Sequence, residues 1–330
     1  MNWKNKKVLI TGSEGFIGSH LAERLLKEGA KVRAFVLYNF SNSWGWLESF
    51  PKDKMRRIEV FSGDIRDYNN IYDAMEGVDV VFHLAALIGI PFSYHSQDTY
   101  IDANIKGTVN ILQAARRLKT ERIVHTSTSE VYGTAQYVPI NEEHPINPQS
   151  PYAATKAAGD YLALSFHKSF NLPVTVLRPF NTFGPRQSAR AVIPAIITQI
   201  LSEKSVISLG NLDTMRDMTY VSDIVDAFVK VAETEGTIGN VYNAGSNREI
   251  CIRDLAELIM KTLKRKAKII QDRSRLRPEK SEVMQLVCNF EKIKNVCGWE
   301  PVIPLEKGIK LTCDWFKNHM DKYKPDIYTI

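Results

Sequence analysis

The sequence predicts an α/β fold: a doubly wound parallel sheet with a smaller, interleaved C-terminal lobe. Strand and helix signals alternate through the first half of the 330-residue chain. The first strand signal ends in a glycine-rich turn at residues 11–18. The alternation stops near Pro179, after which proline and glycine become frequent and the elements shorten. Repeated strand–helix units are typical of parallel sheets with helices on both faces.

The individual elements follow from the period of the apolar residues. Short apolar runs bounded by turn residues indicate buried strands, and apolar residues three or four positions apart, such as Ile17, Leu21 and Leu25, indicate helices. The expected strands are Lys7–Thr11, Lys31–Leu37, Arg57–Phe61, Asp79–Leu84, Arg122–Ser127 and Pro173–Arg178. The expected helices are Phe16–Lys27, Tyr68–Met75, Asp98–Leu118 and Pro151–Phe170.

After residue 179 the chain is expected to build the second lobe and to return once to the sheet. The helix Val221–Glu233 and the strand Val241–Ala244 make that return, and Ile252–Leu263 and Pro304–Asn318 are helices of the second lobe. We therefore expect a sheet domain of residues 1–178 and about 218–245. Residues 179–217 and 246–330 form the other lobe, with a cleft between the two.

The composition is that of an ordinary globular protein, with 44% hydrophobic and 24% charged residues. No apolar run reaches the ~18 residues of a membrane helix, and the N-terminus has no secretory apolar region, so we expect a cytoplasmic protein without membrane contact. The net charge of +6 comes without the basic and aromatic pattern of nucleic-acid binding, and it suits small acidic ligands such as diphosphates. The four cysteines and seven histidines lack metal-ligand spacing, so no metal is expected.

The glycine-rich turn has the spacing of a dinucleotide-binding loop. It reads Thr11-Gly12-Ser13-Glu14-Gly15-Phe16-Ile17-Gly18 and joins the first expected strand to the first expected helix. Glycine permits a tight turn and a close approach of the backbone to a pyrophosphate, and the N–H groups of the helix N-terminus attract its charge. A plain turn is the alternative. In this context the motif predicts a Rossmann-type site with contacts from Gly12, Gly15, Phe16, Ile17 and Gly18.

The end of the second strand bears on which dinucleotide is bound. An acid there bonds the ribose 2′-hydroxyl and repels a 2′-phosphate, but this chain has Tyr38 and Asn39. Asn39 can still bond the hydroxyl, and no arginine follows directly to neutralise a phosphate. NAD is therefore favoured, with NADP as the alternative. Asp64 and Ile65, after the third strand, are expected near the adenine.

A polar run follows the fifth expected strand, where open α/β sheets place their ligands. It contains Thr128, Ser129 and Glu130, and Tyr152 and Lys156 lie one turn apart at the start of a later helix. The ammonium group, together with a nicotinamide cation, is expected to lower the phenol pKa from about 10. The set suits oxidation of an alcohol, followed by removal of a proton next to the new ketone. An interfacial tyrosine beside a surface lysine is the alternative.

Together these motifs resemble the extended short-chain dehydrogenase/reductase family over nearly the whole chain. The resemblance implies a bilobal enzyme that acts on a nucleotide-diphosphate sugar, with UDP favoured over GDP, as a homodimer joined through a four-helix interface. The matching segments are Thr11-Gly12-x-x-Gly15-x-x-Gly18, Asp64, His83-Leu84-Ala85-Ala86, Asn104, Ser127-Thr128, Tyr152-x-x-x-Lys156, Arg178-Pro179-Phe180-Asn181, Arg216-Asp217, Tyr220-Val221, Arg277-Pro278 and Gly298-Trp299.

The resemblance also implies roles for single residues. Thr128 would lie at the sugar O4 beside Tyr152. Asn181, Arg216 and Arg277 would surround the diphosphate and nucleotide, where guanidinium groups suit phosphate oxygens. The further cofactor contacts would be Leu84, Ala85, Ala86 and Asn104.

The run Thr128-Ser129-Glu130 resembles the triplet of sugar 4,6-dehydratases, many of which carry Asp at the Ser129 position; GDP-mannose dehydratases share the serine. A closer resemblance is to enzymes of bacterial nonulosonic (legionaminic or pseudaminic) acid pathways. It implies that Leu87 and Ser93 lie at the substrate, where an apolar wall suits a methyl or acetamido group. Its cues are Ser41-Asn42-Ser43-Trp44-Gly45-Trp46 and Leu87-Ile88-Gly89-Ile90-Pro91-Phe92-Ser93-Tyr94.

Three enzyme activities remain open. The leading one is a 4,6-dehydratase of a nucleotide-diphospho-N-acetylhexosamine, in which Glu130 removes the C5 proton of a 4-keto intermediate and Ser129 or Glu130 assists loss of the C6 hydroxide. The second converts a 4-keto-5,6-ene sugar to the C5-inverted 4-keto-6-deoxy sugar, and there an acid at position 129 is not needed. The third is C4 epimerisation, which needs no base at C5. A non-catalytic, cofactor-sensing protein would usually lack Tyr152 or Lys156.

Overall fold

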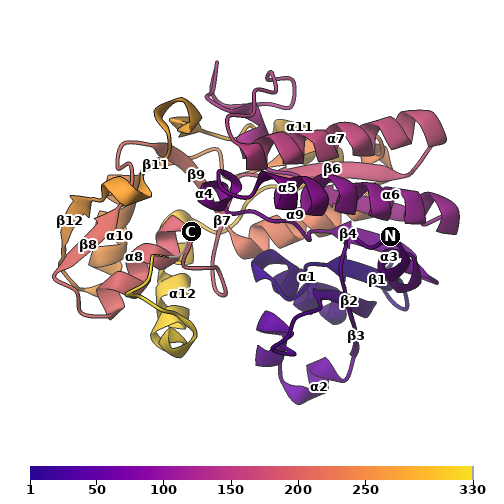
Figure 1. The fold of residues 1–330 in the computed structure, drawn as a ribbon, viewed down its shortest axis with the longest axis horizontal. Helices are drawn as coiled ribbons and strands as arrows, with labels where there is room; N and C mark the ends of the chain where they lie inside the picture. The colour runs from indigo at the N-terminus through magenta and orange to yellow at the C-terminus, as the bar shows by residue number, and fades with distance from the viewer. Residues whose placement is uncertain (329–330) are drawn as a thin grey trace.

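The computed structural model describes residues 1–328, and a seven-stranded sheet forms its larger domain (Figure 1). The strand order is β3-β2-β1-β4-β5-β6-β10, and every neighbouring pair is parallel. The order reverses beside β1, and doubly wound sheets bind ligands outside the carboxyl ends of their strands at such a point. The strands are β1 (Lys7–Thr11), β2 (Lys31–Leu37), β3 (Ile58–Gly63), β4 (Val80–His83), β5 (Arg122–Thr126), β6 (Val174–Pro179) and β10 (Val241–Ala244).

Helices cover both faces of this sheet, as repeated strand–helix units require. Side chains alternate along β1, so Val8 and Ile10 join one hydrophobic core and Leu9 joins the other. The first core includes α1 (Phe16–Lys27), α9 (Val221–Glu233) and α11 (Glu291–Cys297). The second includes α3 (Tyr68–Met75), α6 (Gly107–Leu118) and α7 (Pro151–Phe170). The predicted fold class is confirmed.

The helix expected at Asp98–Leu118 is not one uninterrupted α-helix. It consists of α5 (Gln97–Tyr100), a π-helical segment (Ile101–Lys106) and α6. A π turn holds one residue more than an α turn, and an apolar period does not reveal it. The expectation of a regular helix was therefore wrong at this point.

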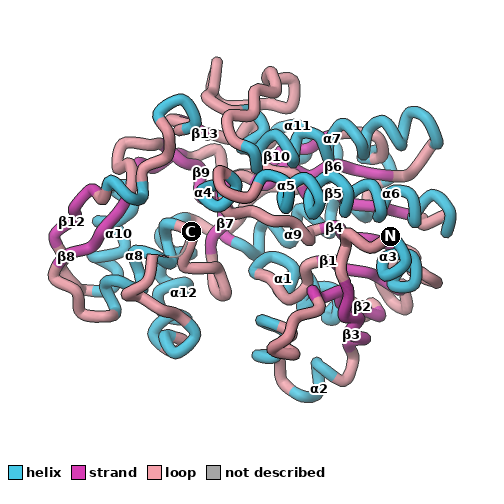
Figure 2. The backbone as a smooth tube through the Cα atoms, viewed as in Figure 1, coloured by secondary structure: helices cyan, strands magenta, loops and turns pink. Residues whose placement is uncertain are grey.

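The second lobe has smaller sheets (Figure 2). It also has its own hydrophobic core. Its strands are β7 (Asn181–Phe183), β8 (Val206–Leu209), β9 (Met215–Tyr220), β11 (Glu249–Cys251), β12 (Lys268–Gln271) and β13 (Gln285–Leu286). Its helices are α8 (Val192–Leu201), α10 (Ile252–Leu263) and α12 (Leu305–Lys317). The sequence predicted α10 and α12 but not these strands; β9, for example, reads Met-Arg-Asp-Met-Thr-Tyr, which shows neither an apolar run nor a strict alternation.

Short elements occupy the loops that follow the strands of the large sheet. They are α2 (Lys52–Met55), α4 (Ile90–Ser93) and 3₁₀ segments at Gly45–Ser49 and Ser129–Tyr132. Within residues 1–328, none of the helices has the length and apolar character that crossing a bilayer requires.

Candidate active site

A cavity of about 1170 Å³ lies at the carboxyl ends of the parallel strands and is lined by residues of both lobes. The large sheet contributes the glycine-rich turn and the loops after β2, β3, β4 and β5. The second lobe contributes β7, the segment after it and Arg277. The cavity therefore lies outside the carboxyl ends of the strands, where doubly wound sheets bind their ligands.

The glycine-rich turn forms one end of the cavity, where Gly12, Gly15, Phe16, Ile17 and Gly18 all line the wall. Gly12 has a φ of +70°, and a Cβ atom on Gly18 would lie 2.2 Å from the Gly12 carbonyl oxygen, so neither position tolerates a side chain. Helix α1 begins at Phe16 without a side-chain cap. Its first N–H groups are thus available to an anion.

The loop after β4 is anchored to the glycine-rich turn through Thr11. The Thr11 hydroxyl accepts hydrogen bonds from the N–H groups of Leu84 and Ala85, each at 3.1 Å, and lies 2.8 Å from His83 Nδ1. Burial lowers the pKa of His83 to about 3, so the imidazole is neutral. This anchoring places Leu84, Ala85 and Ala86 on the cavity wall; their role as cofactor contacts stays a prediction.

The loops after β2 and β3 place their predicted residues differently. Asp64 and Ile65 line the cavity. Arg66 lies 2.6 Å from one Asp64 carboxyl oxygen, and its hydrogen bond lowers the pKa of Asp64. Asn39 does not line the cavity, because its side chain bonds Leu37 and Ser43 within its own loop.

The five predicted catalytic residues line the same cavity. Thr128 ends the extended segment after β5, and its hydroxyl accepts a hydrogen bond from the Glu130 N–H. Ser129 and Glu130 begin the 3₁₀ segment that follows. Tyr152 and Lys156 lie one turn apart on α7 and are only 7% and 4% exposed. The structure therefore brings together two hydroxyls, a carboxylate, a phenol and an amine from two segments of the chain.

The electrostatics of this group differ from the expectation for the phenol. Burial raises the pKa of the Tyr152 phenol, and the nearby Thr128 hydroxyl opposes this rise only in part. Burial lowers the pKa of Lys156 to about 8, with Asp160 acting in the other direction. In the protein alone, the phenol pKa is therefore raised rather than lowered, because removal from water outweighs the hydrogen bond with Thr128.

Helix α7 carries a third ionisable group one turn beyond Lys156. Asp160 is buried and accepts hydrogen bonds from Ser127 at 2.8 Å and from Arg178 Nε at 2.9 Å. These contacts tie α7 to the ends of β5 and β6. They hold Tyr152 and Lys156 in fixed positions relative to Thr128.

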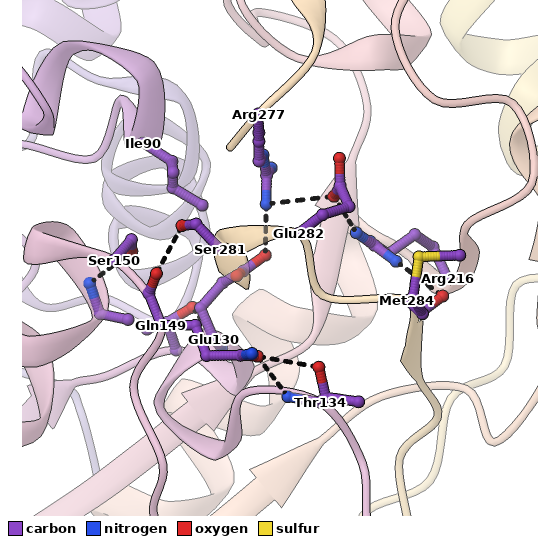
Figure 3. A network of polar contacts seen from close by, with 12 residues as sticks. Ile90, Glu130, Thr134, Gln149, Ser150, Arg216, Arg277, Ser281, Glu282 and Met284 are labelled. Atoms are coloured by element: carbon purple, nitrogen blue, oxygen red, sulfur yellow. Dashed lines mark hydrogen bonds and ion pairs between the residues drawn. The ribbon is translucent and has the colours of Figure 1, made fainter. Parts of the chain in front are cut away.

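The opposite end of the cavity contains a network of charged side chains (Figure 3). Arg277 lines the cavity, and its Nη1 atom lies 3.7 Å from Glu130 Oε1 and 3.8 Å from Glu282 Oε1. Glu282 also lies 3.5 Å from Arg216 Nη2. Arg216 does not line the cavity, since its guanidinium faces Glu282 and the Met215 carbonyl oxygen. Within this network, Arg277 is the cationic side chain that lines the cavity, so it is the one placed to meet an anion.

Two further predicted residues stay behind the cavity wall. Asn104 is buried, and its side chain bonds both backbone groups of Leu87 and the Thr155 hydroxyl. Ser93 is buried and donates a hydrogen bond to the Ile90 carbonyl oxygen. Leu87 itself lines the cavity. Asn104 and Ser93 thus shape the wall from behind.

Some lining residues were not predicted from the sequence. The segment after β7 contributes Arg186, Gln187, Ser188 and Arg190, and the C-terminal region contributes Lys322 and Tyr328. A signal for the first group is Gly184-Pro185, which marks a turn directly after Asn181–Phe183. Glu14, within the glycine-rich turn, also lines the cavity.

The cavity contains buried polar atoms without hydrogen bonds from the described residues. They include Asn181 Oδ1, Gln187 Oε1 and Arg277 Nη1, all on residues that line the wall. Unsatisfied buried polar groups are costly, so such atoms indicate a polar ligand. These three residues belong to the second lobe, and Glu14 Oε2 and Thr126 Oγ1 of the sheet domain are further buried atoms of this kind on the wall.

Comparison with known proteins agrees with this geometry. The family model described as GDP-mannose 4,6 dehydratase matches residues 9–312. A dTDP-glucose 4,6-dehydratase of Streptomyces niveus is 31% identical over 324 residues, which cover 97% of this chain and 95% of the relative. A UDP-glucuronate 4-epimerase of Thermodesulfobacterium geofontis is 30% identical over 324 residues, which cover 96% and 98%.

A solved structure of a nucleotide-sugar epimerase has the same fold. The UDP-glucuronic acid 4-epimerase of Bacillus cereus, in complex with UDP-glucuronic acid and NAD, superposes with a TM-score of 0.86 at 28% identity. The match covers 95% of this chain and 99% of that one. The chain is therefore an enzyme of the extended short-chain dehydrogenase/reductase family, in its branch of nucleotide-sugar dehydratases and epimerases.

Proposed function

We propose that this enzyme is an NAD-dependent 4,6-dehydratase of a nucleotide-diphospho-N-acetylhexosamine, with UDP favoured over GDP. The observation that carries the proposal is that Thr128, Ser129, Glu130, Tyr152 and Lys156 line one cavity. That cavity also contains the glycine-rich turn at one end and Arg277 at the other. It thus has room for a dinucleotide and a sugar nucleotide with the reactive groups between them.

The residues present fit a dinucleotide. The uncapped N-terminus of α1 suits the pyrophosphate, and Asp64 and Ile65 suit the adenosine end. Lys156, beside Tyr152, suits the nicotinamide ribose. NAD supplies the acceptor for the hydride from the sugar C4 and the donor for its return to C6, and NADP remains the alternative.

The protein side chains accept and donate the protons that the reaction transfers. Tyr152, with Thr128 beside it, takes the O4 proton as C4 becomes a ketone. The ketone acidifies the C5 proton, which Glu130 removes, and hydroxide leaves C6 with a proton from Ser129 or Glu130. After C6 is reduced, C5 takes a proton back. The net change is loss of one water, which gives a 4-keto-6-deoxy sugar.

The second lobe suits the nucleotide diphosphate. Arg277 offers its guanidinium to phosphate oxygens. Asn181 and Gln187 have side-chain oxygens without hydrogen bonds from residues 1–328, and these can accept hydrogen bonds from hydroxyl or N–H groups of the nucleotide. On the side of the sheet domain, Leu87, Ile88, Ile90 and Pro91 of the loop after β4 supply an apolar wall for a methyl or acetamido group. A place in a nonulosonic acid pathway and a homodimer stay predictions from the resemblance.

Ser129 favours a second candidate function. A serine hydroxyl is a poor proton donor, and Ser129 is only 2% exposed. Addition of hydride at C6 and a proton at C5 of a 4-keto-5,6-ene hexosamine releases no hydroxide, so it needs no acid at that position. C4 epimerisation is the third candidate, and the similarity to 4-epimerases supports it.

One experiment separates the three candidates. Purified enzyme is incubated in deuterated water with UDP-GlcNAc, GDP-GlcNAc and the ene intermediate, and the products are analysed by mass spectrometry and by NMR, which distinguishes a C4 epimer from its substrate. A product lighter by one water and deuterated at C5 supports dehydration, and turnover of only the ene supports the second candidate. An isomer without deuterium indicates epimerisation and contradicts the dehydratase. The Glu130→Gln variant should lose C5 deuteration but keep most of any epimerase activity.

A further inference from the structure

The cofactor end of the cavity lacks the acid that usually follows β2. Tyr38 takes its place in the sequence and is 77% exposed. Asn39, the other residue at this point, has its amide and carbonyl groups committed to Leu37, Ser41 and Ser43. Neither side chain lines the cavity. Recognition of an adenosine ribose therefore needs another residue.

Glu14 brings a carboxylate to the same place from the glycine-rich turn. Its Oε1 atom accepts a hydrogen bond from the N–H group of Leu37, the last residue of β2, at 2.9 Å. Glu14 lines the cavity together with Leu37. The side chain of the first loop thus reaches the end of the second strand, where a ribose-binding acid would lie.

The second carboxyl oxygen of Glu14 is not used. Oε2 is buried and has no hydrogen-bond donor among residues 1–328. Burial also raises the pKa of Glu14, although the Leu37 N–H acts against this rise. A buried carboxyl oxygen without a donor is costly, and a hydroxyl group of a ligand would remove that cost.

A neighbouring segment holds Glu14 in position. The Trp46 N–H donates to the Glu14 carbonyl oxygen at 3.0 Å. A Cβ atom on Gly45 would lie 2.7 Å from that oxygen, so the 3₁₀ segment Gly45–Ser49 packs directly on the turn. Trp46 in turn packs edge-on against Trp315 of α12, with ring centroids 5.4 Å apart. Both lobes therefore contribute to the placement of Glu14.

We propose that Glu14 binds the adenosine ribose hydroxyls of the dinucleotide in place of an acid after β2, and that it makes the enzyme prefer NAD over NADP. The inference rests on the proposed dinucleotide site. A carboxylate accepts hydrogen bonds from ribose hydroxyls and repels a 2′-phosphate. Arg66, the cationic side chain that lines the cavity beside Asp64, donates hydrogen bonds to both Asp64 carboxyl oxygens, so its guanidinium is already paired with a carboxylate.

The test compares NAD and NADP binding by wild type and by Glu14→Ala. Binding is measured by calorimetry on protein freed of dinucleotide, and mass spectrometry identifies the dinucleotide that copurifies with each variant. Wild type should bind NAD more tightly than NADP. Glu14→Ala should bind NAD ~10-fold or more weakly, as expected for loss of a charged hydrogen bond, with NADP binding unchanged or tighter. Glu28→Gln, an exposed glutamate at the end of α1, should behave as wild type.

A rescue variant separates recognition from structural support. Glu14→Ala combined with Tyr38→Asp moves the acid to the end of β2, and Tyr38 is exposed enough to change without repacking. The double variant should regain the preference for NAD. Equal weakening of NAD and NADP by Glu14→Ala, or no regained preference in the double variant, would overturn the inference.

The outcomes also distinguish this inference from the proposed function. If wild type binds neither dinucleotide, both proposals fail. If wild type binds NAD and Glu14→Ala keeps its full preference, only the role of Glu14 fails. If the NAD preference depends on Glu14 while no sugar nucleotide is turned over, the sugar chemistry fails and the role of Glu14 stands.

Discussion

Arg277 Nη1 lies 3.7 Å from Glu130 Oε1, so the guanidinium proposed to bind the diphosphate contacts the carboxylate proposed to act at C5 (Figure 3). Burial acts to lower the pKa of Arg277, but the charges of Glu130 and Glu282 raise it above its ordinary value. The arginine thus stays cationic although it is largely enclosed. The groups proposed to bind the diphosphate and to act on the hexose are therefore in direct contact.

Replacing Arg277 should therefore affect binding and turnover together. We expect Arg277→Leu to raise the KM for the sugar nucleotide by about 10- to 100-fold, as for loss of a charged hydrogen bond, and to lower kcat because Glu130 loses its partner. Arg277→Lys should recover part of the loss in KM and in kcat, since lysine keeps the positive charge but not the planar guanidinium that forms two parallel hydrogen bonds. Steady-state kinetics give the two values. Arg253→Leu, on an exposed ion pair of the same lobe, is the control. An unchanged KM in Arg277→Leu would contradict the assignment.

Tyr152→Phe should lower kcat by about 10² to 10⁴, the usual contribution of an acid–base group. The phenol is the group proposed to take the O4 proton, and its removal leaves a ring of nearly the same shape. Binding of the dinucleotide, measured by calorimetry, should change little. Tyr161→Phe lies on the same helix and is 61% exposed, so it should keep full activity. Turnover of every candidate sugar nucleotide at the wild-type rate in Tyr152→Phe would refute the mechanism.

Gly18→Ala should disrupt the glycine-rich turn. Its Cβ atom would lie 2.2 Å from the Gly12 carbonyl oxygen, so the backbone must move. We expect dinucleotide affinity to fall by at least ~10-fold, together with a lower Tm, because overpacking typically costs about 1–3 kcal/mol. Gly236→Ala is a matched control, since the nearest atom to its Cβ is a Val296 methyl at 3.8 Å. Normal NAD affinity and Tm in Gly18→Ala would show that the turn is looser than this packing implies.

Lys156→Met should change how stability depends on pH. Burial lowers the folded-state pKa of Lys156 from 10.5 to about 8. Between these values the unfolded chain keeps the lysine proton while the folded chain has released it, so this group makes stability rise with pH. Below pH 8 the folded protein bears the full cost of the buried charge, of the order of 3 kcal/mol.

The variant removes that cost, so it should exceed wild type in free energy of unfolding by more at pH 7 than at pH 10. Urea denaturation at the two pH values measures the difference. The comparison between wild type and variant cancels the other groups that titrate in this range. If the free energies of unfolding of variant and wild type differ by the same amount at both pH values, Lys156 is not desolvated in the folded protein.

The sheet domain could be predicted because its elements are encoded locally. The strands β1 and β2 and the helices α1, α3 and α7 occupy the residues predicted for them. Each has a clear apolar period or a start signal in its own residues. The glycine-rich turn and the Thr128, Tyr152 and Lys156 set could be placed for the same reason: motif spacing and strand ends determine where such side chains lie in a parallel sheet.

The tertiary structure decided what depends on contacts between distant segments. In the fold, the Asn104 side chain bonds the backbone of Leu87, and the Asn39 side chain bonds within its own loop. The Glu14 side chain lies at the end of β2. The fold also places Arg277 beside Glu130, 147 positions earlier in the chain (277 − 130). Local sequence reports the period and the chemistry of each segment, whereas burial, ion pairing and pKa depend on which segments the fold packs together. The sequence alone therefore determined the sheet, the glycine-rich turn and the candidate catalytic set, and only packing determined the partners and charge states of these side chains.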